Sequence, residues 1–445
     1  MRQLVVRNCA VLVVPEVGEC SIEPARDIWI DDGVITAIKP TSPVVAEGIK
    51  VVEGCGLLAV PGLTNSHTHS PMVLMRGAAE DLPLDRWFNE RIWPMEVNLT
   101  PELVRVGARL ACAEMLLGGV TTFVDHYFHS DQIAFAAAET GIRADLAPTF
   151  FSSNGPDERE AAYDAARGIG ELGLDRVTAS LGPHAPYTVT GKDLERTAEV
   201  ARAEGFRIHL HAAETMDQTT SSQARFGVTP VEVLERTGVL DAGSLIAHGC
   251  GILPGDLAIL ERYADRTAVA SCPKVYLKMA IGSTTPFRGL REAGIAVGAG
   301  TDGAAVHNTL DVWEALRLIG LVEKQNERDA TWMTVSDVLR MATRGGAAAA
   351  GLGAKAGALE AGRLADIALV DLNQPHVQPV HDPRAALVYS TRASDVVTVI
   401  VDGDVVVHER RLIRLDLADI VCQAREVAPR LVDFSQGGSV QTYQP

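Results

Sequence analysis

The chain has 445 residues, of which 47% are hydrophobic and 22% are charged, so it can bury the core of one large domain and a smaller one. Its formal net charge of −17 excludes functions that need a basic surface, such as nucleic-acid binding. No segment approaches the roughly 18 apolar residues of a membrane span, and the seven scattered cysteines contain no CxxC pair, so we expect a cytoplasmic protein without disulfides.

Both ends of the chain have the alternating, turn-punctuated texture of β-structure. Segments such as DIWIDDGVITAI lie in residues 1–60, and VVTVIVDGDVVVH lies near the C-terminus, with Asp402-Gly403 as a hairpin turn. We expect residues 1–60 and 359–432 to form one small β-sandwich domain with a terminal helix. Residues 433–445 are expected to be a flexible tail.

The middle of the chain, residues 61–358, alternates short apolar strands with helical patterns. One helix is expected to begin with Thr100 as its cap and Pro101 in its first turn, and to stop at Gly118-Gly119. Eight strand candidates occupy residues 59–65, 120–125, 143–150, 177–182, 206–211, 244–248, 267–271 and 295–300. Eight strand-then-helix units predict an α/β fold, a (β/α)8 TIM-like barrel, whose chemistry gathers at the C-terminal ends of the strands.

Histidines and one aspartate stand at those strand ends. His67 and His69 follow the first strand, and alternate residues of an extended chain can present two imidazoles to one ion. His211 ends the fifth strand, His248 ends the sixth, and Asp302 follows the eighth. Their convergence on one barrel mouth predicts a metal site. His209 is expected to face the opposite side of its strand from His211 and to pack in the core.

The segments PGLTNSHTHS, GPHAPYT, HLHAAET, AHGC and GTDGAA resemble the amidohydrolase superfamily over essentially the whole chain. The resemblance is closest to its 5'-methylthioadenosine/S-adenosylhomocysteine deaminases, with the triazine chlorohydrolases nearby. It implies one metal ion per subunit, held by His67, His69, His211 and Asp302, because the bridging lysine of two-metal relatives is missing from GPHAPYT. Three imidazoles and a carboxylate favour Zn²⁺, and Fe²⁺ also fits.

The resemblance also implies how protons move. His248 would lie beside the hydrolytic water, and Asp302 would both bind the metal and pass the water's proton to the leaving amine. Glu214 would carry a proton between water and a ring nitrogen. Without a metal nearby, Glu214 would be read as a solvated loop carboxylate.

Other residues are candidates for substrate contacts. Glu96 matches a family glutamate that binds ribose hydroxyls, and Arg159 matches, by a loose loop alignment, an arginine that binds the carboxylate of S-adenosylhomocysteine. His184 would touch the base or the leaving group, or else be structural, and Trp93 is either a stacking wall or helix core. Two residues depart from the family pattern: His307 in TDGAAVHN is expected in a substrate-facing loop, and Tyr276 in SCPKVYLK either fills space beside the substrate or points away from it.

These residues predict a zinc-dependent aminohydrolase that releases ammonia from S-adenosylhomocysteine, 5'-methylthioadenosine or a related adenosine compound. The resemblance implies a homodimer or homotetramer. The alternatives are a triazine chlorohydrolase, a deaminase of guanine, pterin or another aminoheterocycle, and a non-catalytic barrel. Glu214 favours deamination, because chloride needs less help from a proton to depart.

Overall fold

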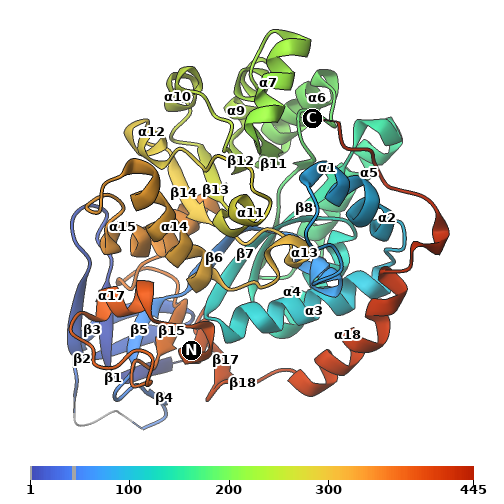
Figure 1. Cartoon of the computed structure of the whole chain (residues 1–445). Helices are drawn as coiled ribbons and strands as arrows, with labels where there is room; N and C mark the ends of the chain where they lie inside the picture. The colour runs from blue at the N-terminus through green and yellow to red at the C-terminus, as the bar shows by residue number, and fades with distance from the viewer. Residues whose placement is uncertain (1–2, 43–46, 445) are drawn as a thin grey trace.

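In this computed structural model, residues 3–42 and 47–444 are described. A barrel of strands and helices occupies most of the molecule, and a sheet made from both ends of the chain lies beside it (Figure 1). No helix in these two ranges is long and apolar enough to cross a membrane.

The terminal sheet contains nine strands in the order β18-β17-β16-β15-β5-β1-β2-β3, with β4 also paired to β1. The N-terminal strands are β1 (Gln3–Val13), β2 (Ser21–Asp31), β3 (Val34–Pro40), β4 (Lys50–Glu53) and β5 (Leu58–Pro61). The C-terminal strands are β15 (Ile367–Val370), β16 (Val396–Val401), β17 (Asp404–His408) and β18 (Arg411–Leu412). β15 pairs antiparallel with β5 and so joins the two ends. The expected β domain built from both termini is confirmed.

The hairpin between β16 and β17 shows why the sequence turns where predicted. Asp402 and Gly403 have φ angles of 52° and 75°, the two positive values that a tight two-residue hairpin turn requires. Glycine adopts such a φ without cost, and aspartate tolerates it better than most residues.

The barrel strands run parallel in two hydrogen-bonded groups. They are β6 (Leu63–Thr68), β7 (Val120–Tyr127), β8 (Arg143–Phe150), β9 (Val177–Ala179), β10 (Gly182–Pro183), β11 (Ile208–Ala212), β12 (Ser244–His248), β13 (Thr267–Ser271) and β14 (Ala296–Ala299). Backbone hydrogen bonds close the ring, from His211 N to His184 O at 3.0 Å and from Thr301 N to His67 O at 3.1 Å. The predicted barrel is confirmed.

Two predicted strands have different bounds. Residues 59–61 pair in the terminal sheet as part of β5, so the first barrel strand begins only at Leu63. The fourth strand is interrupted, and its two parts, β9 and β10, both pair with β8.

Helices surround the barrel and carry its connections. The longer ones are α3 (Pro101–Leu117), α4 (Ser130–Thr140), α5 (Pro156–Glu171), α6 (Gly191–Glu204), α7 (Met216–Phe226), α10 (Pro254–Glu261), α14 (Val312–Glu327) and α18 (Leu417–Leu431). Shorter segments are η1 (Ser70–Met75), α1 (Leu84–Trp87), η2 (Phe88–Ile92), α2 (Trp93–Glu96), η3 (Ser152–Asn154), α8 (Pro230–Arg236), α9 (Val239–Ala242), α11 (Pro273–Lys278), α12 (Phe287–Glu292), α13 (Ala304–His307), α15 (Val335–Arg340), η4 (Met341–Gly345), α16 (Gly346–Ala349), α17 (Pro383–Tyr389), η5 (Ala393–Asp395) and η6 (Phe434–Gln436). As predicted, the Thr100 hydroxyl caps α3 by accepting a hydrogen bond from Leu103 N at 3.3 Å.

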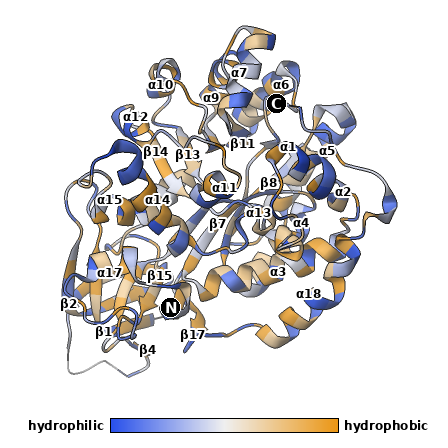
Figure 2. Cartoon of the chain, in the orientation of Figure 1, coloured by the Kyte–Doolittle hydropathy of each residue, from blue (hydrophilic) through white to orange (hydrophobic). Residues whose placement is uncertain are grey.

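Helix α18 shows how the surface helices pack. Its buried residues, Ile420, Ala424, Val427 and Leu431, recur at the spacing of one helical face. Figure 2 shows the corresponding bands of hydrophobic and hydrophilic colour along this helix. Its apolar face therefore packs on the protein while its polar face meets solvent.

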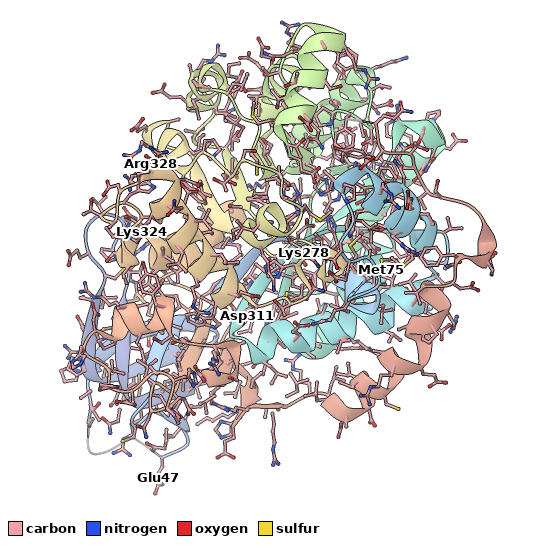
Figure 3. All side chains as sticks on the ribbon, in the orientation of Figure 1. Glu47, Met75, Lys278, Asp311, Lys324 and Arg328 are labelled. Atoms are coloured by element: carbon pink, nitrogen blue, oxygen red, sulfur yellow. The ribbon has the colours of Figure 1, made fainter. Side chains whose placement is uncertain are left out.

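Loops at the mouth of the barrel are tied together by one lysine. The Lys278 ammonium at the end of α11 lies 2.5 Å from Glu80 Oε2 and 2.5 Å from Asn308 Oδ1, which belong to the loops after η1 and α13. Figure 3 labels Lys278 in this central position, while Glu47 lies at the far end of the terminal sheet. Lys278 thus links two loops at the C-terminal ends of the barrel strands that are far apart in the sequence.

Candidate active site

The first strand end supplies two imidazoles. His67, with no exposed surface, directs its Nδ1 to His209 Nε2 at 2.9 Å. The Nδ1 of His69 lies 2.6 Å from the carbonyl oxygen of His126, to which only an N–H can donate. The Nε2 of His69 is therefore the nitrogen left for a ligand.

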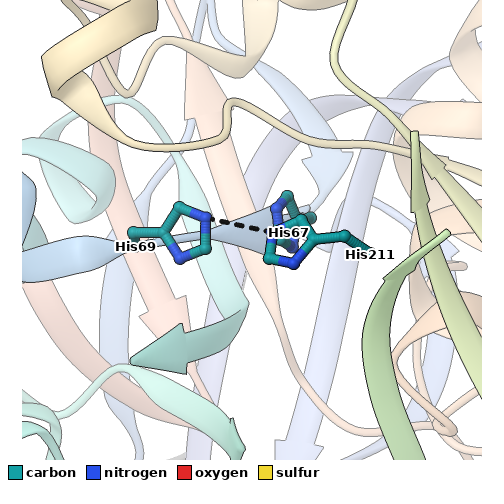
Figure 4. Close-up of side chains that lie close together, drawn as sticks. All are labelled: His67, His69 and His211. Atoms are coloured by element: carbon teal, nitrogen blue, oxygen red, sulfur yellow. Dashed lines mark hydrogen bonds between the residues drawn. The ribbon is translucent and has the colours of Figure 1, made fainter. Parts of the chain in front are cut away.

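His211 at the end of β11 is oriented in the same way. Its Nδ1 donates to the carbonyl oxygen of His184 at 2.9 Å, so its Nε2 carries the free lone pair. Figure 4 shows the rings of His67, His69 and His211 converging, with the dashed line joining His69 to His211. The Nε2 atoms of those two residues are 3.3 Å apart. Metal-binding histidines are commonly oriented by such hydrogen bonds from the opposite ring nitrogen.

Asp302 brings a carboxylate to these nitrogens. Its Oδ1 lies 3.0 Å from His69 Nε2 and 3.6 Å from His67 Nε2, and it accepts a hydrogen bond from Gly303 N at 2.8 Å. Asp302 and His248 have φ angles of 57° and 76°, a left-handed conformation that costs energy for residues other than glycine. Such strain is often kept at functional sites because it aims a side chain.

The arrangement fits a metal ion. The ligand atoms of His67, His69 and His211 lie within 4.8 Å of one another, as do those of His67, His248 and Asp302. His67 Nε2 is buried and has no hydrogen-bond partner among the described residues, so an ion would satisfy an atom that is otherwise costly to bury. Imidazole nitrogens with one carboxylate are a donor set of zinc and related divalent metals.

The contact between Asp302 and His69 shifts the pKa values of both side chains. Burial opposes ionisation of Asp302, but the adjacent imidazoles of His67 and His69 hold the pKa of its carboxyl well below the usual range. Burial likewise opposes protonation of His69, yet its hydrogen bond to Asp302 and the aspartate charge raise the pKa of this imidazole to about 9. A metal ion that binds His69 Nε2 must displace this proton.

His209 is buried, as predicted, but the prediction that it faces the opposite side of its strand from His211 was wrong. Residues two apart on a strand face the same side, and His209 lies inside the barrel like His211, with its Nε2 hydrogen-bonded to His67 Nδ1. Burial and the charges of His67 and His126 lower the pKa of His209 well below its usual value. It is therefore a neutral partner beneath His67.

Glu214 is enclosed and held in place. It is only 4% exposed, which excludes a solvated loop carboxylate. Gln218 contacts it twice, because Gln218 Nε2 donates to Glu214 Oε2 at 3.0 Å and Glu214 N donates to Gln218 Oε1 at 3.0 Å. The Tyr187 hydroxyl lies 3.5 Å from Oε2, and His248 Nε2 lies 4.0 Å from Oε1.

A cavity of about 50 Å³ opens beside these groups and is lined by His69, His211, Glu214, His248 and Asp302 together with Trp93, Glu96 and His184. Burial raises the pKa of the Glu96 carboxyl to about 7. Burial, followed by the charges of neighbouring histidines, lowers the pKa of His184 to about 3, so that imidazole is neutral. Trp93 is almost fully buried but contributes to the wall. These placements keep all three as candidates for substrate contact.

Three predicted substrate residues do not line this cavity. The Arg159 guanidinium is paired with Asp193 and with Glu160 at 2.9 Å, so its charge is used in a surface network. The Tyr276 hydroxyl accepts a hydrogen bond from Cys272 N at 2.7 Å and serves the backbone. His307 is buried beside Thr309, with 3.3 Å between its Nδ1 and the hydroxyl.

Several residues around the site were missed. Phe151 and Tyr187 line the cavity, and Gln218 and Tyr443 lie behind Glu214. Gln218 could have been found, because it stands four residues after Glu214 across a helix start capped by Thr215. No local pattern connects Tyr443, at the other end of the chain, to this site.

Comparisons with known proteins agree with this architecture. The profile of the Amidohydrolase family matches residues 58–406. A 5-methylthioadenosine/S-adenosylhomocysteine deaminase from Pelotomaculum thermopropionicum is 39% identical over 97% of this chain and 100% of its own. An adenosine deaminase from Xanthomonas campestris, solved with bound zinc, is 31% identical with a TM-score of 0.90 and coverage of 96% and 98%. The zinc-bound atrazine chlorohydrolase from Arthrobacter aurescens is 27% identical with a TM-score of 0.85 and coverage of 96% and 100%.

The chain belongs to the amidohydrolase family. It is a hydrolase with a histidine and aspartate cluster suited to a metal ion.

Proposed function

We propose that this protein is a zinc-dependent aminohydrolase that removes the exocyclic amine of an adenosine compound, such as S-adenosylhomocysteine or 5'-methylthioadenosine. The observation that carries the proposal is the position of buried Glu214, 4.0 Å from His248 and on the wall of the same cavity as His69, His211 and Asp302. A proton-transfer carboxylate beside a metal cluster is what deamination of a ring requires. The relatedness to proteins with deaminase names over nearly the full chain supports this substrate class.

His67, His69, His211 and Asp302 would hold the ion. When bound, zinc lowers the pKa of a coordinated water so that hydroxide is available near neutral pH. The hydrogen bonds from Nδ1 of His69 and His211 to backbone carbonyls fix the two rings so that Nε2 is the nitrogen aimed inward toward the ion. Fe²⁺ is compatible with the same donors.

Proton movements follow from the positions of the side chains. Asp302 accepts the proton of the attacking water and later delivers it to the leaving amine. Glu214 takes the other proton of that water and gives it to the ring nitrogen next to the attacked carbon, and its hydrogen bond from Gln218 keeps the carboxylate turned toward the cavity. His248 lies close to both Asp302 and Glu214. It can therefore stabilise the oxygen that becomes negative during attack.

The opposite side of the cavity would bind the rest of the substrate. Glu96 can accept hydrogen bonds from the two ribose hydroxyls, and Trp93 lies beside His184 with ring centroids 6.3 Å apart. A purine placed between Trp93 and the strand ends would bring its amine toward His184. Ammonia then leaves beside a neutral imidazole.

A second candidate is hydrolysis of a triazine or another aminoheterocycle, which the likeness to the atrazine chlorohydrolase favours. The test is an ammonia-release assay of zinc-loaded protein with adenosine, 5'-methylthioadenosine, S-adenosylhomocysteine, guanine, pterin and an aminotriazine, and a chloride-release assay with a chlorotriazine. We expect turnover of the adenosine compounds. Turnover of the other rings alone would overturn the substrate assignment, and chloride release alone would overturn deamination.

We further propose that residues 61–358 form the catalytic domain and that residues 1–60 and 359–432 form the β domain. The change from the terminal sheet at Pro61 to the barrel at Leu63 supports this division. All seven cysteines are unpaired, which supports a cytoplasmic location. The family resemblance suggests a homodimer or homotetramer, which light scattering of the purified protein would test.

A further inference from the structure

The C-terminal tail, residues 433–444, differs from the flexible segment predicted from sequence. It leaves α18 and runs along the outside of the barrel past α2 and α5 to the side of α6 (Figure 1). Asn98 Nδ2 donates to the carbonyl of Asp433 at 2.6 Å, Gln441 Nε2 donates to Ser153 Oγ at 3.1 Å, and Val440 N donates to Trp93 O at 3.4 Å. The tail is therefore attached to the protein along its course.

Tyr443 anchors the end of this tail. Its backbone N donates to Asn89 Oδ1 at 2.7 Å, and Asn89 Nδ2 donates back to its carbonyl oxygen at 3.4 Å. The ring stacks on Phe88 with centroids 5.1 Å apart and an interplanar angle of 12°. Tyr443 is only 7% exposed although it is two residues from the end of the chain.

The Tyr443 hydroxyl reaches the residue that holds Glu214. Gln218 Nε2 lies 3.3 Å from this hydroxyl oxygen and 3.0 Å from Glu214 Oε2, so each of its two hydrogens has an acceptor. Gln218 Oε1 accepts from Glu214 N. All hydrogen-bonding groups of this amide are thus used, and the amide can neither turn nor shift without losing a partner.

The ring of Tyr443 also supports the cavity wall. Phe88, on which it stacks, and Tyr187, whose ring centroid is 5.5 Å away at an angle of 74°, both line the cavity. Trp93, a third lining residue, lies 6.4 Å away between centroids. Removal of the tail would expose the outer side of these aromatic rings to water.

We propose that the C-terminal tail is part of the active-site architecture, and that Tyr443 is a positioning residue that fixes Glu214 through Gln218 and supports the aromatic wall against which the substrate lies. This inference rests on the proposed role of Glu214 in proton transfer. The Tyr443 hydroxyl positions Glu214 through Gln218, whereas the Tyr443 ring supports the aromatic wall of the cavity. The two effects can therefore be separated by substitution.

The experiment compares Tyr443→Phe, Tyr443→Ala and a chain ending after Gly437 with the wild type, all zinc-loaded. Tyr443→Phe keeps the stacking ring, so we expect kcat to fall by roughly three- to tenfold, as for the loss of one neutral hydrogen bond, with little change in KM. Tyr443→Ala and the truncated chain lose the wall as well, so KM should rise in addition. Tyr263→Phe, which follows α10 and is not among the residues that line the cavity, is the matched control and should change neither constant.

Hydrogen exchange gives a readout that needs no substrate. The Glu214 amide, which donates to Gln218 Oε1, should exchange faster in Tyr443→Phe than in the wild type, while amides of β12 keep their protection. Unchanged exchange and unchanged kcat in the truncated chain would overturn the proposal. If exchange increases but no adenosine compound is turned over even by the wild type, the tail's positioning role stands and the proposed substrate class fails.

Discussion

The Nδ1 of His67 and the Nε2 of His209 share a hydrogen bond of 2.9 Å inside the barrel. When His67 binds a cation through Nε2, its Nδ1 must carry a proton and donate to His209. His209 must then be neutral, and its burial ensures this by lowering its pKa. The contact therefore favours the His67 tautomer with its proton on Nδ1, which leaves Nε2 able to bind a metal ion.

His209→Phe should weaken zinc binding by about 10- to 100-fold, because His67 loses the acceptor that orients it. The measurement is competition for zinc with a chromophoric chelator. His209→Gln retains an acceptor and is the matched variant, with a smaller loss expected. Equal zinc affinity in His209→Phe and the wild type, with unchanged circular dichroism, would show that His209 only fills space.

Glu214→Gln should keep zinc content near one per chain and lower kcat by about 100-fold or more, the usual contribution of a general acid or base. The amide keeps the shape of the side chain but cannot carry the proton. Metal analysis and ammonia release measure the two quantities on the same sample. Glu199→Gln, at an exposed position of α6, is the control, and loss of zinc from Glu214→Gln would assign Glu214 to the ligands instead.

Glu96 should make the metal-free protein less stable as the pH rises from 4.5 through 7. Burial raises the pKa of its carboxyl from 4.5 to about 7, so the folded state holds this proton more tightly than the unfolded chain. The resulting stabilisation is complete below pH 4.5 and is lost as the pH rises through 7. Compared with the wild type, Glu96→Gln should therefore gain stability between pH 5 and pH 8, by on the order of 3 kcal/mol at most.

Urea unfolding of both proteins at pH 5 and pH 8 measures this difference. A constant difference between the two proteins across that range would show that Glu96 does not titrate there.

In the zinc-loaded enzyme, Glu96→Gln should also raise KM for nucleosides, because a neutral amide accepts hydroxyl hydrogen bonds less strongly than a carboxylate.

Zinc binding should release protons. In the metal-free protein His69 is protonated against Asp302, with a pKa of about 9, so at pH 7.5 zinc must displace that proton. Calorimetric titrations in two buffers of different ionisation enthalpy should give release of about one proton per zinc ion. Heats that do not depend on the buffer would contradict the pairing of His69 with Asp302.

Removal of the metal with a chelator should abolish ammonia release, and added zinc should restore it. The same treatment should leave the barrel folded, because its strands are joined by backbone hydrogen bonds that do not involve the metal. Activity that survives removal of all divalent metal would end the proposed mechanism.

Much of the fold could be read from local patterns in the chain. The cap at Thr100, the hairpin at Asp402-Gly403 and the individual strand segments depend on neighbours within a few residues, and each is present in the structure. Placing His69, His211 and Asp302 at strand ends needed only the rule that parallel strands of a barrel end on one side. These features are encoded by hydrophobic period, turn residues and position along a strand.

Contacts between distant segments could not be read in this way. Gln218 and Tyr443 are 225 residues apart in the chain and share a hydrogen bond, and Arg159 pairs with Asp193 instead of facing the cavity. Such partners depend on the direction of individual side chains and on which loops pack together, and these are set by the closed barrel and its packed rim. The residue types at the strand ends thus follow from the chain itself, whereas the partners that orient them exist only once remote segments are in contact.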